Sequence, residues 1–192
     1  MKLKMIAKIQ SGYINRGKID PRDDGNCLLL QAKDVDADRL SYCTDALVRF
    51  LPRLSGKDWF LKPGDILFMA RGARNFSVLI DKPPDHVLAA ACFFVVRIAI
   101  SEILPIYLCW YLNQSPVEEY LKRFSGRGVH MPVIRRAVLE SIDIPLPSMN
   151  TQKQVSEMTM LLQREQNLYK KLAEKRKNLM TQICLRAAFK SF

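Results

Sequence analysis

From Thr151 to Phe192 the chain contains neither proline nor glycine. A stretch of this length without a helix breaker exceeds an ordinary globular helix and is typical of a coiled coil or a spacer rod. The strand-like segment Ile142–Pro147 precedes it and contains two prolines, so we expect a helix from about Thr151 to Ala188. At about 1.5 Å per residue, this helix is roughly 50 Å long. Such a rod holds parts of an assembly apart or docks a partner.

Apolar residues recur along the expected helix at alternating steps of three and four. They are Val155, Met158, Leu162, Tyr169, Leu172, Leu179 and Ile183. Glu165 and Arg176 are polar positions in the same register, as in coiled coils that fix register with polar residues. A stripe of this kind can also pack on its own domain, but for so long a rod we favour an intermolecular partner. The basic clusters at 170–171 and 175–177 are interpreted as a solvated face.

Residues 1–149 have the pattern of a strand-rich mixed domain, so the fold class is α+β with a long C-terminal helix over 150–192. Short apolar runs bounded by Gly, Asn and Asp are typical of strands. The expected strands are Met5–Ile9, Cys27–Gln31, Ile66–Ala70 after a Pro63-Gly64 turn, Phe76–Ile80 and Leu88–Ile98. Helical spacing then predicts helices over Ser101–Asn113 and Ser115–Phe124, and a short helical turn over Arg135–Leu139.

The chain is strongly basic, with a formal net charge of +11. Residues 1–150 carry +5 of this charge and residues 151–192 carry +6. A protein of this charge favours a polyanion as its partner, because Lys and Arg side chains that neutralise phosphates release condensed counterions. We therefore favour nucleic acid over the alternative that the charge binds nothing in particular.

Several classes of protein lack support in the sequence. No run of about eighteen apolar residues occurs, so we expect no membrane span, and the N-terminus lacks the pattern of a signal peptide. The five cysteines are odd in number and form no Cys-x-x-Cys pair, which favours reduced thiols and a cytoplasmic location. Neither glycine-rich nucleotide-binding pattern is present. We expect no cofactor and no catalytic constellation.

One group of acidic residues has the spacing of a possible metal site. Asp34, Asp36 and Asp38 alternate, so all three could share one face of a strand and resemble a metal site. An exposed strand end is the more common origin of this pattern, and we therefore expect no metal. The only two histidines, His86 and His130, lie in no cluster of potential ligands.

Six segments, in their order and spacing, resemble half of the specificity (S) subunit of type I restriction–modification enzymes. They are Ile6–Tyr13, Leu29–Val35, Leu61–Gly72, Tyr107–Asn113, Ile142–Pro147 and Gln152–Gln154. The resemblance implies a target recognition domain over 1–149 and a spacer and dimerisation helix over 150–192. It also implies double-stranded DNA, a methyltransferase (M) subunit and a restriction (R) subunit as partners, which carry out the catalysis. S subunits contain two such units and this chain contains one, so we expect a half-subunit that forms a homodimer, or a truncated or split gene product. A two-fold pair reads an inverted, interrupted site.

The resemblance does not name the residues that read DNA, and candidates come from chemistry. Arg and Lys side chains pair with guanine, and Asn and Gln with adenine. The candidates in predicted loops are Lys33, Arg71, Arg74, Asn75, Arg127 and His130, with Arg16 and Lys18 as phosphate contacts. The helix residues expected to pair the two copies are Val155, Met158, Leu162, Tyr169, Leu172 and Leu179.

Two other functions remain open at this point. The chain could be a structural adaptor whose rod assembles other proteins and whose charge is incidental. It could also be an enzyme that acts on DNA alone, for which Asp34, Asp36 and Asp38 are the only available carboxylate group.

Overall fold

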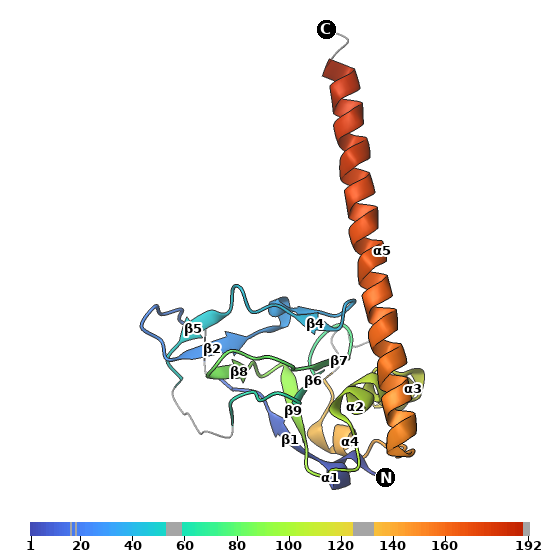
Figure 1. Cartoon of the computed structure of the whole chain (residues 1–192). Coiled ribbons are helices and arrows are strands. Elements are labelled where there is room, and N and C mark those ends of the chain that lie inside the picture. Colours follow the sequence, from blue (N-terminus) through green and yellow to red (C-terminus); the bar gives the residue numbers. More distant parts are fainter. Residues whose placement is uncertain (16, 18, 53–58, 125–132, 190–192) are drawn as a thin grey trace. The chain divides into compact units, whose positions relative to one another are not determined.

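The computed structural model describes residues 1–15, 17, 19–52, 59–124 and 133–189. The chain divides into two compact units, Met1–Lys153 and Gln154–Phe192 (Figure 1). The first unit contains all the strands found in the described ranges and four α-helices, and the second unit is helical throughout its described part. The α+β class expected from the sequence is confirmed.

The strands of the first unit are short and form three sheets. Their bounds are β1 Ala7–Ser11, β2 Cys27–Leu30, β3 Val35–Asp36, β4 Ser41–Tyr42, β5 Val48–Phe50, β6 Ile66–Met69, β7 Ser77–Leu79, β8 Val87–Ala89 and β9 Phe93–Ile98. The largest sheet has the order β1-β9-β6-β7 and is antiparallel throughout. The second has the order β5-β2-β8, in which β2 and β8 run parallel. A two-residue ladder joins β3 to β4.

The helices are mostly short. Their bounds are α1 Leu3–Ile6, the 3₁₀ turn η1 Ala32–Asp34, α2 Pro105–Leu112, α3 Ser115–Lys122, α4 Arg136–Glu140 and α5 Met149–Phe189. Both α2 and α3 carry proline in their first turn, where the missing N–H costs nothing. The predicted α2, α3 and α4 helices are confirmed within a few residues at each end.

The hydrophobic core of the first unit lies between the sheets. β6 is buried along its whole length, because the large sheet packs on the β2 and β8 strands on one side and carries α2 beside β7. The main cluster consists of Leu30, Val35, Leu61, Leu67, Met69, Phe76, Val78, Ile80, Val87, Ala89, Phe93 and Val95. A smaller cluster surrounds Phe50, whose ring lies 5.3 Å from that of Tyr13.

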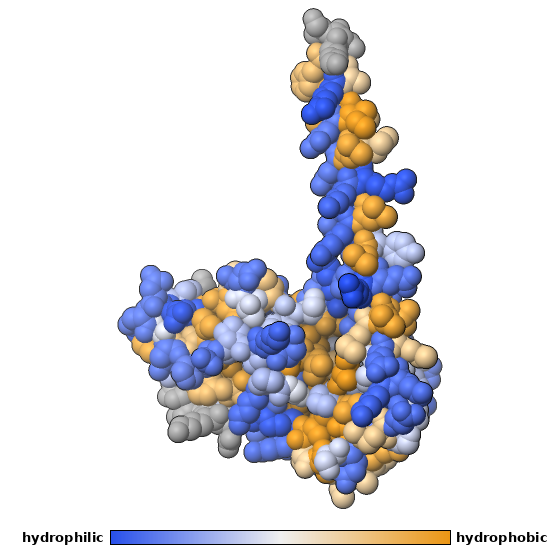
Figure 2. All heavy atoms as spheres, in the orientation of Figure 1, coloured by the Kyte–Doolittle hydropathy of each residue, from blue (hydrophilic) through white to orange (hydrophobic). Residues whose placement is uncertain are grey.

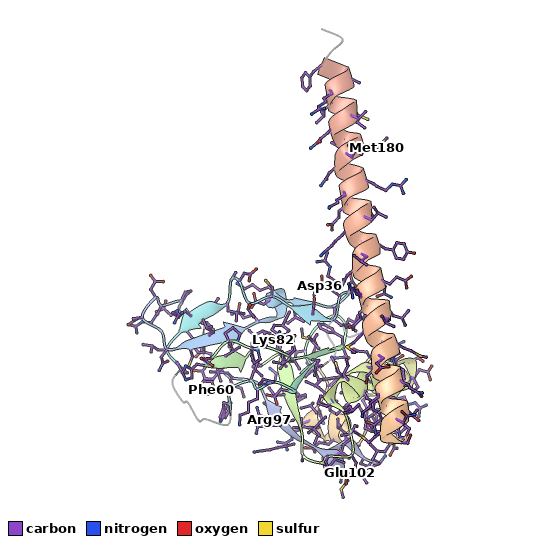
Figure 3. The ribbon with its side chains drawn as sticks, in the orientation of Figure 1. Asp36, Phe60, Lys82, Arg97, Glu102 and Met180 are labelled. Atoms are coloured by element: carbon purple, nitrogen blue, oxygen red, sulfur yellow. The ribbon has the colours of Figure 1, made fainter. Side chains whose placement is uncertain are left out.

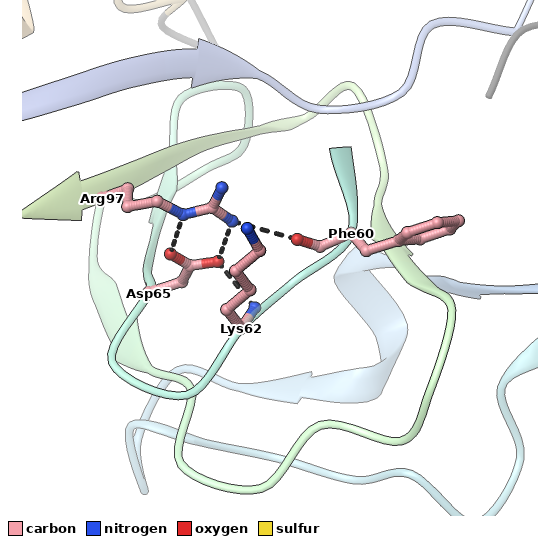
Figure 4. A network of polar contacts seen from close by, with 4 residues as sticks. All are labelled: Phe60, Lys62, Asp65 and Arg97. Atoms are coloured by element: carbon pink, nitrogen blue, oxygen red, sulfur yellow. Dashed lines mark hydrogen bonds and ion pairs between the residues drawn. The ribbon is translucent and has the colours of Figure 1, made fainter. Parts of the chain in front are cut away.

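A buried ion pair crosses the large sheet at the start of β6. Arg97 on β9 donates from Nε and Nη2 to the carboxylate of Asp65, at 2.7 and 2.6 Å (Figure 4). The same Nη2 donates to the carbonyl of Phe60, and Asp65 also accepts the Lys62 backbone N–H at 2.8 Å. Phe60 and Arg97 are also labelled in Figure 3, where their side chains lie on neighbouring parts of the first unit. The Pro63-Gly64 turn predicted before this strand is confirmed, and Gly64 has the positive φ of 89° that glycine tolerates.

Several predicted elements need correction. The first strand begins two residues late, because Leu3 and Ile6, three apart, bury one face of the short helix α1. The segment Leu88–Ile98 is not one strand: β8 and β9 are separated by a turn and lie in different sheets. Ile142–Pro147 forms no strand, although its backbone pairs locally with the N-terminal residues. The strands β3, β4 and β5 were not predicted.

The long helix α5 begins at Met149 and ends at Phe189, which confirms the predicted span within two residues. Ser148 caps it, since its Oγ accepts the Thr151 backbone N–H at 3.2 Å. Apolar side chains form a stripe along the helix, visible in Figure 2, and Met180 extends from it into solvent in Figure 3. Within the described ranges, no helix is long and apolar enough to cross a membrane.

Candidate nucleic-acid interface

Three strand ends of the first unit converge on the turn between β8 and β9, residues 90–92, which we call the anchor turn. The chain that leaves β1 is bound to the two residues that flank this turn, because the N–H of Tyr13 donates to the carbonyl of Ala89 at 2.7 Å and the N–H of Gly12 donates to the carbonyl of Phe93 at 2.9 Å. Gly12 lies so close that a Cβ on it would be 2.1 Å from the carbonyl oxygen of Ala90. Only glycine permits this approach, so the path of the chain after β1 is fixed at this point.

The chain segments that leave β2 and β6 are bound to the same turn. The N–H of Ala90 donates to the carbonyl of Leu30 at 2.9 Å. The carbonyl of Cys92 accepts the backbone N–H groups of both Ala70 and Arg71, at 2.8 and 3.1 Å. The loops that follow three strands therefore start side by side.

A fourth segment joins this group from much later in the chain. Val133 forms an antiparallel bridge with Arg71, and the N–H of Ile134 donates to the carbonyl of Ala70 at 2.9 Å. The segments that carry the predicted DNA contacts thus have described residues next to the anchor turn. Four of the predicted contacts lie outside the residues that the structure describes: Arg16, Lys18, Arg127 and His130.

Lys33 lies in η1, directly after β2. A reciprocal cap holds this turn, since the N–H of Gln31 donates to the Asp34 carboxylate at 2.8 Å and the N–H of Asp34 donates back to the Gln31 carbonyl at 3.0 Å. The Lys33 side chain is exposed and forms no salt bridge to any described residue. The cap therefore presents a free ammonium group on a fixed backbone.

Arg71 and the η1 segment, which carries Lys33, both lie near Cys92. Burial raises the pKa of the Cys92 thiol, whereas a hydrogen bond from the backbone of Ala32 and the positive charge of Arg71 lower it. Cys92 therefore lies within reach of both the η1 segment and the Arg71 guanidinium. Arg71 itself is exposed, and it has no salt-bridge partner in the described part of the chain.

Arg74 and Asn75 follow in the turn that joins β6 to β7. Arg74 forms an exposed salt bridge with Asp38 at 3.6 Å, so the turn lies against the β3–β4 hairpin. Asn75 donates from its side-chain amide to the carbonyl of Met69 at 2.8 Å, which closes the turn. A base contact by Asn75 requires the loss or sharing of this bond, whereas Arg74 only has to exchange a weak surface pair.

A hollow of about 230 Å³ opens beside Arg74, between the β6–β7 turn and the helices α2 and α3. Glu118 and Lys122 line it and form a salt bridge at 2.8 Å. This bond and the positive charges nearby, including Arg74, lower the pKa of Glu118. The hollow therefore has a mixed charge, with Arg74, Glu118 and Lys122 in its lining.

The three aspartates of the metal hypothesis are separated in the structure. Asp34 caps η1, and only Asp36 lies in a strand. Asp36 accepts the N–H groups of Asp38 and Arg39, both at 2.9 Å, while Asp38 pairs with Arg74. Among the described residues, no group of three or more His, Cys, Asp and Glu side chains is placed to hold a metal ion. The three aspartates lie in or beside the β3–β4 hairpin, which also carries Arg39, a cation that is not among the predicted DNA contacts and that pairs with Asp36 at 3.4 Å.

The hairpin is tied to the β7–β8 connection by a polar contact. The Tyr42 hydroxyl donates to Asp81 at 2.7 Å and accepts the Lys82 N–H at 3.0 Å. The Tyr42 hydrogen bond lowers the pKa of Asp81, and burial followed by the Asp81 contact raises the pKa of Tyr42. Figure 3 marks both segments by Asp36 and Lys82.

Two of the segments behind the resemblance, Tyr107–Asn113 and Gln152–Gln154, supply contacts of the scaffold. Asn113 accepts the Ser77 N–H at 2.8 Å and donates to the carbonyls of Ser77 and Cys109, which fastens α2 to β7. Gln152 is fully buried; its amide accepts the Leu104 N–H and donates to the carbonyls of Glu102 and Pro147.

Comparison with known proteins supports the resemblance to S subunits at the level of the fold. No family model matches the sequence. No curated protein matches it either. Among solved structures, the HsdS subunit from Thermoanaerobacter tengcongensis matches over 85% of this chain and 36% of its own, with 17% identity and a TM-score of 0.59. The chain has the S-subunit fold.

Two further structures agree. The type I restriction–modification S subunit from M. genitalium matches over 88% of this chain and 40% of its own, with 16% identity and a TM-score of 0.57. A chain from a structure of type I R-M complex assembly and conformational transition matches over 85% of this chain and 37% of its own, with 17% identity and a TM-score of 0.61. The resemblance inferred from the sequence is therefore confirmed at the level of the fold. The chain spans less than half the length of each S-subunit-like chain.

Proposed function

We propose that this chain is the DNA sequence-recognition part of a type I restriction–modification specificity subunit. The S-subunit fold over most of the chain is the observation that carries this proposal. In this role the first unit reads one half of a bipartite site in double-stranded DNA. The protein itself performs no catalysis and docks methyltransferase and restriction subunits in the cytoplasm.

The polar surface around the anchor turn is the proposed reading surface. Lys33, Arg71 and Arg74 start from neighbouring loops, and their side chains are exposed. Arginine and lysine pair with the O6 and N7 atoms of guanine or neutralise a phosphate. Arg16, Lys18, Arg127 and His130 follow described residues of the same loops, and we propose them as further contacts. The fixed backbone at the turn supports selectivity because it limits the positions that these side chains can take.

The proposed function also includes self-association. The side chains of Met158, Leu162, Tyr169, Leu172 and Leu179 are more than half exposed, which is costly in water unless a partner covers them. We propose that α5 pairs with the α5 of a second copy and, with Val155 at its start, forms the spacer between two reading domains.

Selection from randomised duplex DNA tests the proposal. The purified chain is incubated with the DNA pool, alone and with its M subunit, and the retained DNA is sequenced. We expect an inverted, bipartite motif with a fixed gap. A single ungapped motif would support reading and remove the pair, and the absence of any enrichment under both conditions would refute the proposal.

Point variants locate the reading surface. We expect Arg71→Ala to weaken DNA binding and, if Arg71 contacts a base, to relax the preference at one position by about 1–3 kcal/mol. If it contacts a phosphate, the slope of binding against salt concentration falls by about 0.9 on a log–log plot. Lys8→Ala is the matched control, since Lys8 is an exposed cation inside β1, away from the anchor turn. Equal effects of the two variants would contradict the assigned surface.

A structural adaptor is the second candidate, and the exposed apolar stripe of α5 favours it as much as it favours an S subunit. The two functions differ in the role of the cations. Capture of protein partners that survives charge reversal at Arg71 and Arg74, together with no DNA preference, would favour the adaptor.

A further inference from the structure

Two charged side chains interrupt the apolar stripe of α5, and both are isolated on their own helix. The neighbours three and four residues from Glu165 are Leu161, Leu162, Leu168 and Tyr169, and those of Arg176 are Leu172, Ala173, Leu179 and Met180. Helical residues pair with oppositely charged side chains at these spacings. No cation is therefore in reach of Glu165, and no carboxylate is in reach of Arg176, within the described helix.

The charges become costly when a partner covers the stripe. Removal of a carboxylate or a guanidinium from water is unfavourable unless an opposite charge meets it. Neither Glu165 nor Arg176 forms a salt bridge to any residue that the structure describes. The partner that covers the stripe must therefore supply a cation near Glu165 and an anion near Arg176.

A second copy of the same helix supplies both charges, in one arrangement. The midpoint between Glu165 and Arg176 falls between Lys170 and Lys171. Residues at equal distances on the two sides of this midpoint face each other when two copies run antiparallel. The facing pairs are then Glu165 with Arg176, Leu162 with Leu179, Tyr169 with Leu172, and Met158 with Ile183. From Met158 to Ile183, every apolar position of the stripe meets an apolar position and both charges meet their opposite, while Val155 faces Arg186 outside this span.

Other arrangements of two copies fail on the same residues. In a parallel, in-register pair Glu165 faces Glu165 and Arg176 faces Arg176, so like charges are buried together. In an antiparallel pair shifted by seven residues, Glu165 faces Tyr169 or Ile183 of the second copy and loses its counter-charge. The sequence of α5 thus selects one orientation and one register, by repulsion as well as by attraction.

We propose that Glu165 and Arg176 set the register of self-association, with each Glu165 opposite Arg176 of a second copy in an antiparallel pair. This inference rests on the self-association part of the proposed function and names the residues that determine it. The pair then contains two equivalent charge contacts about 16 Å apart along the helix axis.

Charge exchange in the full chain tests the proposal, with sedimentation equilibrium as the assay. Glu165→Arg and Arg176→Glu each place like charges at both contacts, so each is expected to raise the dissociation constant of the pair at least about tenfold. The double variant, and an equimolar mixture of the two single variants, restore opposite charges and are expected to regain the wild-type value within about threefold. Glu174→Arg and Lys177→Glu are matched controls on faces outside the stripe, and both are expected to associate like the wild type.

Single variants that associate as tightly as the wild type would overturn the proposal, provided that circular dichroism shows α5 intact. A failure of the double variant and of the mixture to recover would also overturn it. A wild-type chain that stays monomeric at every concentration refutes the inference, while the DNA-reading part of the proposed function is judged separately by the selection experiment.

Orientation has its own readout in the exposed Cys184. A spin label is attached there in a Cys43→Ser, Cys92→Ser background, which removes the other exposed and half-buried thiols. In the proposed register the two labels lie about 27 residues apart along the pair, which is roughly 40 Å. A parallel pair places them within about 20 Å of each other. A distance in the short range would refute the antiparallel register.

Discussion

Asp65→Asn is expected to lower the free energy of unfolding of the first unit by about 3 kcal/mol. The Asp65 side chain is 2% exposed and accepts two hydrogen bonds from Arg97 and one from the Lys62 backbone. Loss of one partner of a buried pair costs about 3–5 kcal/mol, because the remaining charge is left without compensation. Arg97 keeps 23% of its side chain in water, which places the expected cost at the lower end.

Urea unfolding followed by tryptophan fluorescence measures this loss. Both tryptophans, Trp59 and Trp110, belong to the first unit, so the signal does not depend on α5. A loss of about 3 kcal/mol corresponds to a fall in melting temperature of roughly 6–12 °C for a unit of this size. The double variant Asp65→Leu, Arg97→Met removes both charges and is expected to be less destabilised than Asp65→Asn alone.

The chain contains a matched control for this prediction. Lys2 and Asp143 form a salt bridge of the same length, 2.6 Å, but their side chains are 46% and 73% exposed. Asp143→Asn is therefore expected to cost less than about 1 kcal/mol. Equal losses in Asp65→Asn and Asp143→Asn would refute the reasoning, because burial would then have no part in the cost.

The other predictions concern hydrogen bonds and titration. Asn113→Ala is expected to cost about 2 kcal/mol, whereas Ser77→Ala is neutral or stabilising in the same assay, since the buried Ser77 hydroxyl has no partner among the described residues. Burial raises the pKa of Cys109 to about 12, so at mildly alkaline pH Cys184 reacts with a thiol reagent and Cys109 reacts only after unfolding. Because the pKa of Asp81 is lowered, its contribution to stability is present above the ordinary pKa of 3.8 and is lost as the pH falls through the lowered pKa. Because the pKa of Tyr42 is raised, its contribution is present below the ordinary pKa of 10.0 and is lost as the pH rises through the raised pKa. Tyr42→Phe is therefore expected to lower stability most at neutral pH and less at both extremes; a constant difference across pH would contradict this.

The elements that could be predicted from the sequence are those whose signals are local. The absence of breakers after Thr151, the prolines that open α2 and α3, and the Pro63-Gly64 turn each depend on the backbone of a few adjacent residues. The two-residue strands β3 and β4 carry too few side chains to show a strand pattern, so the alternating Asp34, Asp36 and Asp38 resembled one face of a longer strand. The separation of β8 from β9 depends on the parallel pairing of β8 with β2, a contact between distant parts of the chain.

In the candidate site, too, the features with a local signal could be predicted and those that depend on the folded backbone could not. Chemistry alone selected Lys33, Arg71 and Arg74 as exposed cations in loops, and the structure places all three near the anchor turn. By contrast, the hydrogen bond from the Asn75 amide to the Met69 carbonyl depends on the geometry of the turn and cannot be predicted from the residue type. The arrangement of charges along α5 was visible as two polar positions, but their isolation from any counter-charge required the helix and its exposed surface.

The bonds at the anchor turn are made by backbone N–H and carbonyl groups, which every residue except proline can offer. The loops that start there can therefore exchange their side chains while their points of attachment stay the same. Among the described residues of this junction, Gly12 is the one that cannot be replaced, because a Cβ on it would clash with the Ala90 carbonyl. Under the proposed function, mutation can accordingly alter what the loops recognise with little loss of folding stability, so this end of the protein is a place where new specificities can evolve.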